Sequence, residues 1–275
     1  MTATKAPRLT REAPDHRSTR PRLFALLLVV VMAVGLATTV VSAASSPPVC
    51  KVADVITKYG YYGHWNRSLL DTYYRLSSLY KPGDLKNTSL AGLNSGFYVR
   101  GFVLADLKSM AYHARNAGAR FSVQSAFRSY ATQKSTFDYW VRVHGYAVAL
   151  KESARAGHSE HQLGTTLDFK SYGGKAPWDY TDWSTTAAGK WLKANAWKYG
   201  FVMSYPKGLT SLTCYTYEPW HYRYVGRAQA AALRASGLTL REYLWIGQTP
   251  GATATPPPTA SPTPTPSPSE VAPPP

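Results

Sequence analysis

The sequence predicts an α+β fold in which short strands carry packed helices. Two kinds of periodicity predict it. Stretches with the composition and alternation of short strands occur at 121–127, 167–169 and 201–205. Longer stretches with apolar residues three and four apart, the spacing of an amphipathic helix, occur at 102–117, 131–150, 186–199 and 228–236.

Turn residues mark where these elements end. Gly118 and Gly237 stand where the first and last helices stop, because glycine is favoured just past a helix C-terminus. Pro206 stops the last predicted strand. Pro219 rules out a regular helix through 218–221, so we expect that segment to be extended and kinked.

Composition divides the chain into four parts. Residues 1–22 are basic and form a cytoplasmic n-region. Residues 23–44 are apolar and then small, as in a signal peptide cleaved after Ala43 or an uncleaved single-pass anchor. Residues 45–248 form the folded domain. Residues 249–275 hold eleven of the 20 prolines among Thr and Ser, so we expect a disordered tail with polyproline II bias.

The net charge of +16 favours an anionic partner. Both interpretations of residues 23–44 place the domain outside the cell membrane, which argues against nucleic acid as that partner. An anionic cell wall or membrane surface fits an exported protein better. The alternative is that the surplus charge only aids solubility.

The chain has two cysteines, Cys50 and Cys214. In an exported protein an even number of cysteines favours a disulfide, and this one would close most of the domain into a single loop. Two other arrangements remain open on the sequence alone: two free thiols, and Cys214 as a fourth ligand of the metal site described next.

Two segments hold the residue types of a metal site. His161 and Asp168 lie in the stretch Ser159-Glu160-His161-Gln162-Leu163-Gly164-Thr165-Thr166-Leu167-Asp168, and Glu218-Pro219-Trp220-His221 follows later. Two histidines and an aspartate make a ligand set for one Zn²⁺ that leaves the fourth position open for water, as in catalytic zinc sites. Glu218 is then the natural base for that water.

These segments resemble the VanY-type D-alanyl-D-alanine carboxypeptidases, zinc peptidases that share a fold with the hedgehog signalling domain. The resemblance includes Ser125-Ala126-Phe127-Arg128-Ser129, Tyr199-Gly200-Phe201 and the run from Glu218 to Gly226, and it covers about residues 65–240. The His-Glu-x-x-His motif of commoner zinc proteases is absent from the sequence. Thr166 departs from the usual alanine of the family, and Cys214 stands where glycine is more usual.

The resemblance implies a hedgehog/DD-peptidase-like fold, in which a small, mainly antiparallel sheet carries packed helices and zinc lies in a cleft on the sheet. Residues 45–248 would then form a zinc D,D-peptidase domain. His161, Asp168 and His221 would hold the metal. Glu218 would take the proton from zinc-bound water and return it to the leaving amine. The reaction would remove the terminal D-alanine from peptidoglycan stem peptides, carried out by a monomer at the outer face of the membrane or in the wall.

Three further residues receive roles from the same resemblance. Arg128 would bind the substrate carboxylate or steady the developing oxyanion. Ser159 and Gln133 would line the substrate pocket. Three other functions use the same residues or fold: an L,D-carboxypeptidase, a stem-peptide endopeptidase, and a wall-binding module without catalysis.

Overall fold

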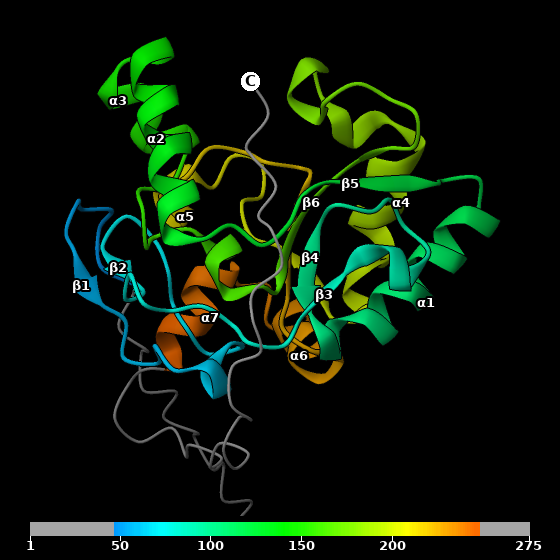
Figure 1. Cartoon of the computed structure of the whole chain (residues 1–275), viewed down its shortest axis with the longest axis horizontal. Helices are drawn as coiled ribbons and strands as arrows, with labels where there is room; N and C mark the ends of the chain where they lie inside the picture. The colour runs from blue at the N-terminus through cyan, green and yellow to red at the C-terminus, as the bar shows by residue number, and fades with distance from the viewer. Residues whose placement is uncertain (1–46, 248–275) are drawn as a thin grey trace, which may run out of the picture. The chain divides into compact units, whose positions relative to one another are not determined.

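The centre of the fold is a four-stranded antiparallel sheet, seen in a computed structural model that describes residues 47–247 (Figure 1). Its strands run in the order β5 (Phe121–Ser125), β6 (Thr166–Ser171), β8 (His221–Tyr224) and β7 (Phe201–Met203). The two inner strands, β6 and β8, are therefore far apart in the sequence and adjacent in the sheet.

Two small ribbons flank this sheet. β3 (Leu85–Asn87) pairs antiparallel with β4 (Tyr98–Arg100), and β1 (Val55–Ile56) pairs parallel with β2 (Tyr74–Arg75). Only that last pair is parallel in the described part of the chain, so the predicted α+β class with a mainly antiparallel sheet is confirmed.

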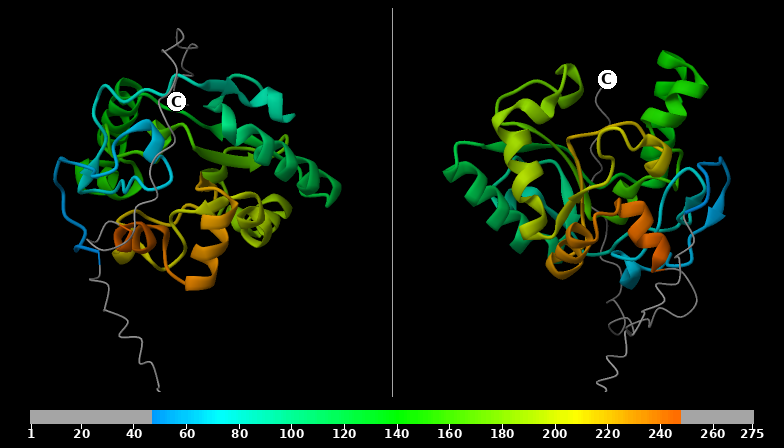
Figure 2. Two further views of the ribbon diagram at one scale, coloured as in Figure 1. Left: turned by 90° about the horizontal axis from the view of Figure 1, so that it is seen from below. Right: turned by 180° about the vertical axis from the view of Figure 1, so that it is seen from behind.

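Helices pack around the sheet in separate groups. The α-helices are α1 (Leu104–Asn116), α2 (Tyr130–His144), α3 (Tyr146–Glu152), α4 (Ala187–Asn195), α5 (Thr210–Thr213), α6 (Arg227–Ser236) and α7 (Leu240–Ile246). Single 3₁₀ turns are η1 (Tyr62–His64), η2 (Thr88–Ala91), η3 (Gly101–Val103), η4 (Glu160–Leu163), η5 (Pro177–Asp179), η6 (Trp183–Thr185) and η7 (Ala196–Tyr199). In each view α2 and α3 stand apart from α1 and α4 (Figures 1 and 2).

The main core lies on one face of the sheet. Alternate residues of β6 and β8 point into it, including Leu167, Phe169 and Tyr222, and meet buried side chains of α1 and α4 such as Met110 and Leu192. Because strand side chains alternate between faces, the residues between them point to the other side. The core thus leaves Asp168 and His221 on the opposite face.

The prediction that residues 131–150 are helical is confirmed, with one interruption. The structure has two helices, α2 and α3, that meet at Gly145, whose φ of 79° lies outside the helical region. Glycine adopts this backbone conformation without a Cβ clash, so the chain turns there. The predicted helix over 186–199 likewise divides into α4 and the turn η7.

Cys50 and Cys214 form a disulfide with their Cα atoms 5.3 Å apart. This confirms the predicted pairing and excludes both free thiols and a metal-ligand role for Cys214. The bond joins the start of the described chain to the end of α5, four residues before Glu218.

Residues 47–247 contain no helix that is long and apolar enough to cross a bilayer. The predicted n-region, signal peptide or anchor, and proline-rich tail lie outside the described residues.

Candidate active site

Strand pairing brings the first two candidate ligands together. In the β6–β8 ladder Asp168 is directly opposite His221, so their side chains share a face. His221 Nδ1 lies 3.1 Å from Asp168 Oδ1. Asp168 and His221 are therefore neighbours in the sheet although α4, β7 and α5 lie between them in the sequence.

The third ligand comes from the 3₁₀ turn η4. Ser159 caps this turn, since its hydroxyl accepts a hydrogen bond from the His161 N–H at 3.3 Å. Gly164 ends it with φ 72°, at a place where a Cβ would lie 3.0 Å from Arg100 Cγ. The turn directs His161 Nε2 to within 3.2 Å of Asp168 Oδ2.

The three side chains fit a divalent cation. One ligand atom from each of His161, Asp168 and His221 lies within 4.8 Å of the others, and all three residues are buried. His161 Nε2 and Asp168 Oδ1 each face another member of the set, but neither makes a hydrogen bond of good geometry within residues 47–247. Buried polar atoms are normally paired, so this convergence of lone pairs suits a metal ion.

The second nitrogen of each histidine ring already contacts an oxygen of the protein. His161 Nδ1 lies 2.6 Å from the Ala126 carbonyl, to which it can only donate. His221 Nε2 lies 3.1 Å from Glu160 Oε2. Each contact leaves the other nitrogen facing Asp168, which is the arrangement that metal-binding histidines require.

The charges of these groups differ in the metal-free chain. Burial, with the Arg128 cation nearby, lowers the pKa of His161 to about 4. Burial would also lower the pKa of His221, but the carboxylates of Asp168 and Glu160, which lie beside its two ring nitrogens, outweigh burial and raise that pKa to about 10. His161 is therefore neutral at pH 7, whereas His221 holds a proton at the position where a metal would bind.

Glu218 lies in the segment just before β8 and directs its carboxylate at His221. Its carbonyl accepts the His221 N–H at 3.2 Å, and its carboxylate Oε2 lies 3.4 Å from His221 Nδ1. The predicted kinked segment around Pro219 is confirmed, since the turn leads directly into β8. Burial raises the pKa of Glu218 to about 7, in the range where a carboxyl group can both accept and donate a proton.

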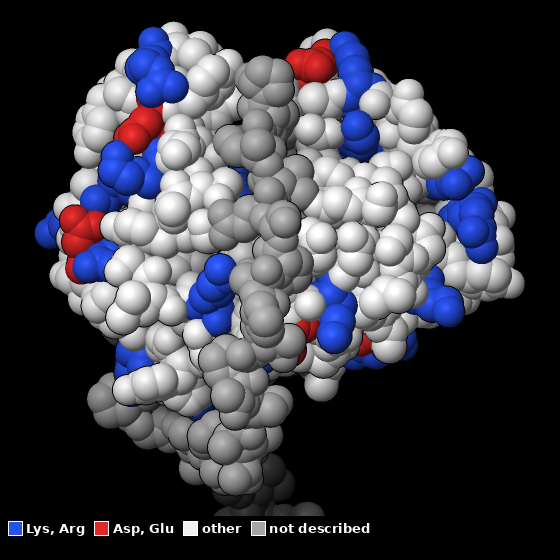
Figure 3. Space-filling view, in the orientation of Figure 1, with Lys and Arg blue, Asp and Glu red and all other residues white. Residues whose placement is uncertain are grey.

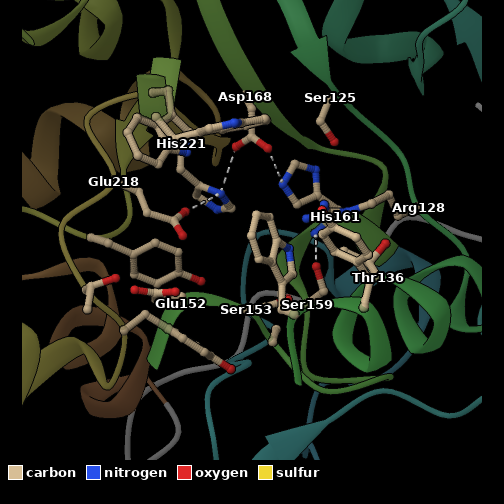
Figure 4. Close-up of a pocket in the computed structure, with 18 of the residues that line it drawn as sticks. Ser125, Arg128, Thr136, Glu152, Ser153, Ser159, His161, Asp168, Glu218 and His221 are labelled. Carbon is tan, nitrogen blue, oxygen red and sulfur yellow. Dashed lines mark hydrogen bonds and ion pairs between the residues drawn. The ribbon is translucent and has the colours of Figure 1, made fainter. Parts of the chain in front are cut away.

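These groups line a cavity of about 780 Å³. Glu218 lies on one side of the two histidines and Arg128 on the other (Figure 4). Burial lowers the pKa of Arg128, and its Nε has no hydrogen-bond partner among residues 47–247. The cavity continues between α2–α3 and the aromatic side chains Trp178, Tyr217 and Trp220.

The predicted pocket residues occupy different places. Ser159 lines the cavity and also caps η4. Gln133 does not line it: its side chain is completely buried in α2, where its amide donates to the Ala154 carbonyl at 2.6 Å. Gln133 therefore lies outside the cavity lining, where its hydrogen bond joins α2 to the segment that leads to Ser159.

Sequence reasoning gave no role to Glu160 and Arg223, which contact each other beneath the site. Arg223 Nη1 donates to Glu160 Oε1 at 2.8 Å, and both side chains are buried. Burial alone would raise the pKa of Glu160, but Arg223, His221 and the Ser204 hydroxyl lower it to about 2. One signal was available: Arg223 follows His221 by two residues on a strand, so both point to the same face.

Comparisons with known proteins indicate one family for this chain. The family model for VanY, D-alanyl-D-alanine carboxypeptidase, matches residues 97–227. YodJ of Bacillus subtilis is 37% identical over 180 residues, which cover 64% of this chain and 66% of YodJ. The chain spans between about half and two thirds of the length of the curated relatives it matches.

Two solved structures share the fold. The LdcB LD-carboxypeptidase superposes with a TM-score of 0.57 at 35% identity, over 65% of this chain and 86% of LdcB. The vancomycin resistance D,D-pentapeptidase VanY, in complex with Zn(II), gives a TM-score of 0.56 at 29% identity, over 66% of this chain and 99% of VanY. With its ligand geometry, fold and family-model match in agreement, the chain belongs to the VanY-type carboxypeptidase family.

Proposed function

We propose that this chain is a zinc-dependent D-alanyl-D-alanine carboxypeptidase that removes the terminal D-alanine from peptidoglycan stem peptides. The observation that carries the proposal is the convergence of His161, Asp168 and His221 within 4.8 Å, with Glu218 beside them on one cavity. A binding module would have no need of a buried carboxyl group held next to three ligands.

His161, Asp168 and His221 would hold one Zn²⁺. When bound, zinc supplies a Lewis acid that polarises a carbonyl and lowers the pKa of water to about 7. Glu218 accepts a proton from the attacking water at its carboxylate and later donates it to the amine of the departing D-alanine. Its pKa of about 7 suits both transfers at neutral pH.

Arg128 binds the free carboxylate at the end of the substrate. Its guanidinium lines the cavity on the side away from Glu218, and a planar fork of donors matches a carboxylate with two parallel hydrogen bonds. A substrate held there by its C-terminus presents its last peptide bond to the space between Arg128 and Glu218. This geometry favours removal of one terminal residue.

The test is amino-acid release from a stem pentapeptide ending in D-Ala-D-Ala, with the tetrapeptide measured in parallel. Zinc-loaded protein, a chelated sample and Glu218→Ala are compared. We expect D-alanine release from the pentapeptide that chelation and the substitution both abolish. Zinc-loaded protein that releases D-alanine from neither peptide would refute the proposal and direct attention to endopeptidase activity on intact peptidoglycan.

An L,D-carboxypeptidase is the second candidate. The observation that favours it is the higher identity to the LdcB LD-carboxypeptidase, 35%, than to the VanY D,D-pentapeptidase, 29%. Both activities use the same proposed metal set and Glu218, so the pocket beyond Arg128 would decide between them. D-alanine release from the tetrapeptide alone would establish this alternative.

We also propose that the protein is exported and that a basic surface holds it against the anionic cell wall. The neighbouring elements α4, η7 and α6 contain no Asp or Glu, and their five cations are Lys190, Lys193, Lys198, Arg227 and Arg234. Of these five, only Arg227 pairs with a carboxylate of residues 47–247, that of Asp106. Basic side chains also gather without acidic neighbours along the edge beside α1 (Figure 3).

The surface proposal predicts binding to purified walls that weakens with salt, because exposed charges are screened. Replacing Lys190, Lys193 and Lys198 by Gln should lower wall binding at low salt and leave hydrolysis of a soluble pentapeptide unchanged. Unchanged wall binding would refute it.

A further inference from the structure

We propose that Glu160 is a positioning residue for His221, fixed in place by Arg223. This inference rests on the proposed zinc binding of the site, and it concerns how firmly the metal is held. No chemical step is assigned to Glu160, since it lies beneath the ligands and does not line the cavity.

The carboxylate of Glu160 is fully satisfied by neighbours on both oxygens. Oε2 accepts the Ser204 hydroxyl at 2.5 Å and lies 3.1 Å from His221 Nε2. Oε1 accepts Arg223 Nη1 at 2.8 Å. Only 4% of the residue is exposed, so water cannot replace these partners.

Arg223 in turn is anchored to backbone. Its Nη2 donates to the carbonyls of Trp65 and Ser68, each at 2.8 Å, and the residue is completely buried. The guanidinium therefore joins the segment after η1 to the carboxylate below the metal site. Three residues far from Glu160 in the sequence, Ser204, His221 and Arg223, hold its carboxylate in one position.

This position determines which nitrogen of His221 carries hydrogen. A carboxylate facing Nε2 keeps a hydrogen on that nitrogen, so that Nδ1, on the Asp168 side, is the nitrogen that would bind a metal. It also makes the ring a stronger ligand, as carboxylate partners of metal-binding histidines do. His161 has only the neutral Ala126 carbonyl as its partner, so the two histidines are supported unequally.

The experiment measures zinc affinity by competition with a chelator for wild type, Glu160→Gln and the double variant Glu160→Gln/Arg223→Gln. Glu160→Gln keeps the shape but leaves the Arg223 cation unbalanced, whereas the double variant removes both charges. The matched control is Asp71→Asn, which breaks another buried pair, Asp71–Arg241 at 2.6 Å, that contacts no proposed ligand. Thermal unfolding of each variant reports any general loss of stability.

We expect Glu160→Gln to bind zinc about 10–100-fold more weakly. The double variant should bind zinc as weakly as Glu160→Gln does. The zinc affinity of Asp71→Asn should be within about twofold of wild type despite a lower Tm. Ring-nitrogen NMR of zinc-loaded wild type should show hydrogen on His221 Nε2 and metal on Nδ1, with the Nε2–H signal shifted in Glu160→Gln.

Two results would overturn the inference. One is zinc affinity of Glu160→Gln within about twofold of wild type. The other is recovery of affinity in the double variant, because it would mean that the unbalanced Arg223 charge caused the loss. Wild-type protein that binds no zinc would instead refute the proposed function.

Discussion

Removing the Cys50–Cys214 disulfide should markedly lower the stability of the domain. The bond joins residues 164 apart, and the chain-entropy model gives about 5 kcal/mol for closing a loop of that length in the unfolded chain. A domain of this size typically has 5–15 kcal/mol of unfolding free energy in total. Cys50→Ser/Cys214→Ser is therefore expected to lower Tm by about 10–20 °C.

Urea unfolding of the oxidised wild type and this double variant measures the loss directly. A second variant, Cys50→Ser/Cys214→Gly, separates backbone strain from loop closure. Cys214 has φ 71° and is the only non-glycine residue with positive φ in the described chain, so glycine should be about 1 kcal/mol better than serine there. A loss below about 1 kcal/mol in the serine variant would refute the loop-closure reasoning, and equal stability of both variants would refute the strain argument.

Three further predictions concern the site. Glu218→Gln should keep zinc affinity within a few-fold and lower hydrolysis about 10²–10⁴-fold; a parallel loss of zinc would contradict its role as a base. Because the metal-free site holds a proton on His221 up to a pKa of about 10, zinc affinity should rise about tenfold per pH unit between pH 6 and 8, and calorimetry in two buffers should detect one released proton. A pH-independent affinity would argue against that proton. Thr166→Val removes a buried hydroxyl that lacks a hydrogen-bond partner in residues 47–247, so urea unfolding should show about 1 kcal/mol of added stability, and a loss would mean that the hydroxyl is satisfied.

The strands β5, β6 and β7 and the longer helices could be predicted from the periodicity of their apolar residues. The inner strand β8 was expected only as part of a kinked, extended segment around Pro219. The break at Gly145 could not be predicted, since the apolar spacing continues across it from Phe137 to Val148. The helix α7 was missed although Thr239 and Glu242 form a capping box, a signal that the sequence contains. The two- and three-residue strands β1 to β4 are too short for any period.

The convergence of His161, Asp168, His221 and Glu218 was predictable because two histidines, an aspartate and a glutamate occur in the order and spacing of a known family. The buried contact between Glu160 and Arg223 beneath these residues was not predictable. A charged residue beside a ligand in sequence is usually solvated, and only the packed structure shows that Glu160 contacts Arg223 across 63 residues. Gln133 shows the converse error, because a polar residue on a helix near the site can face the interior.

The pairing of Asp168 with His221 across β6 and β8 has a consequence for the yield of active protein. A slip of β8 by one residue would turn His221 into the core and Tyr222 toward the cavity, since strand side chains alternate. No intermediate alignment exists that would hold the metal slightly less well. Molecules with the shifted register should therefore have no activity rather than reduced activity. The specific activity of a refolded sample should then be proportional to its fraction of molecules with the correct register.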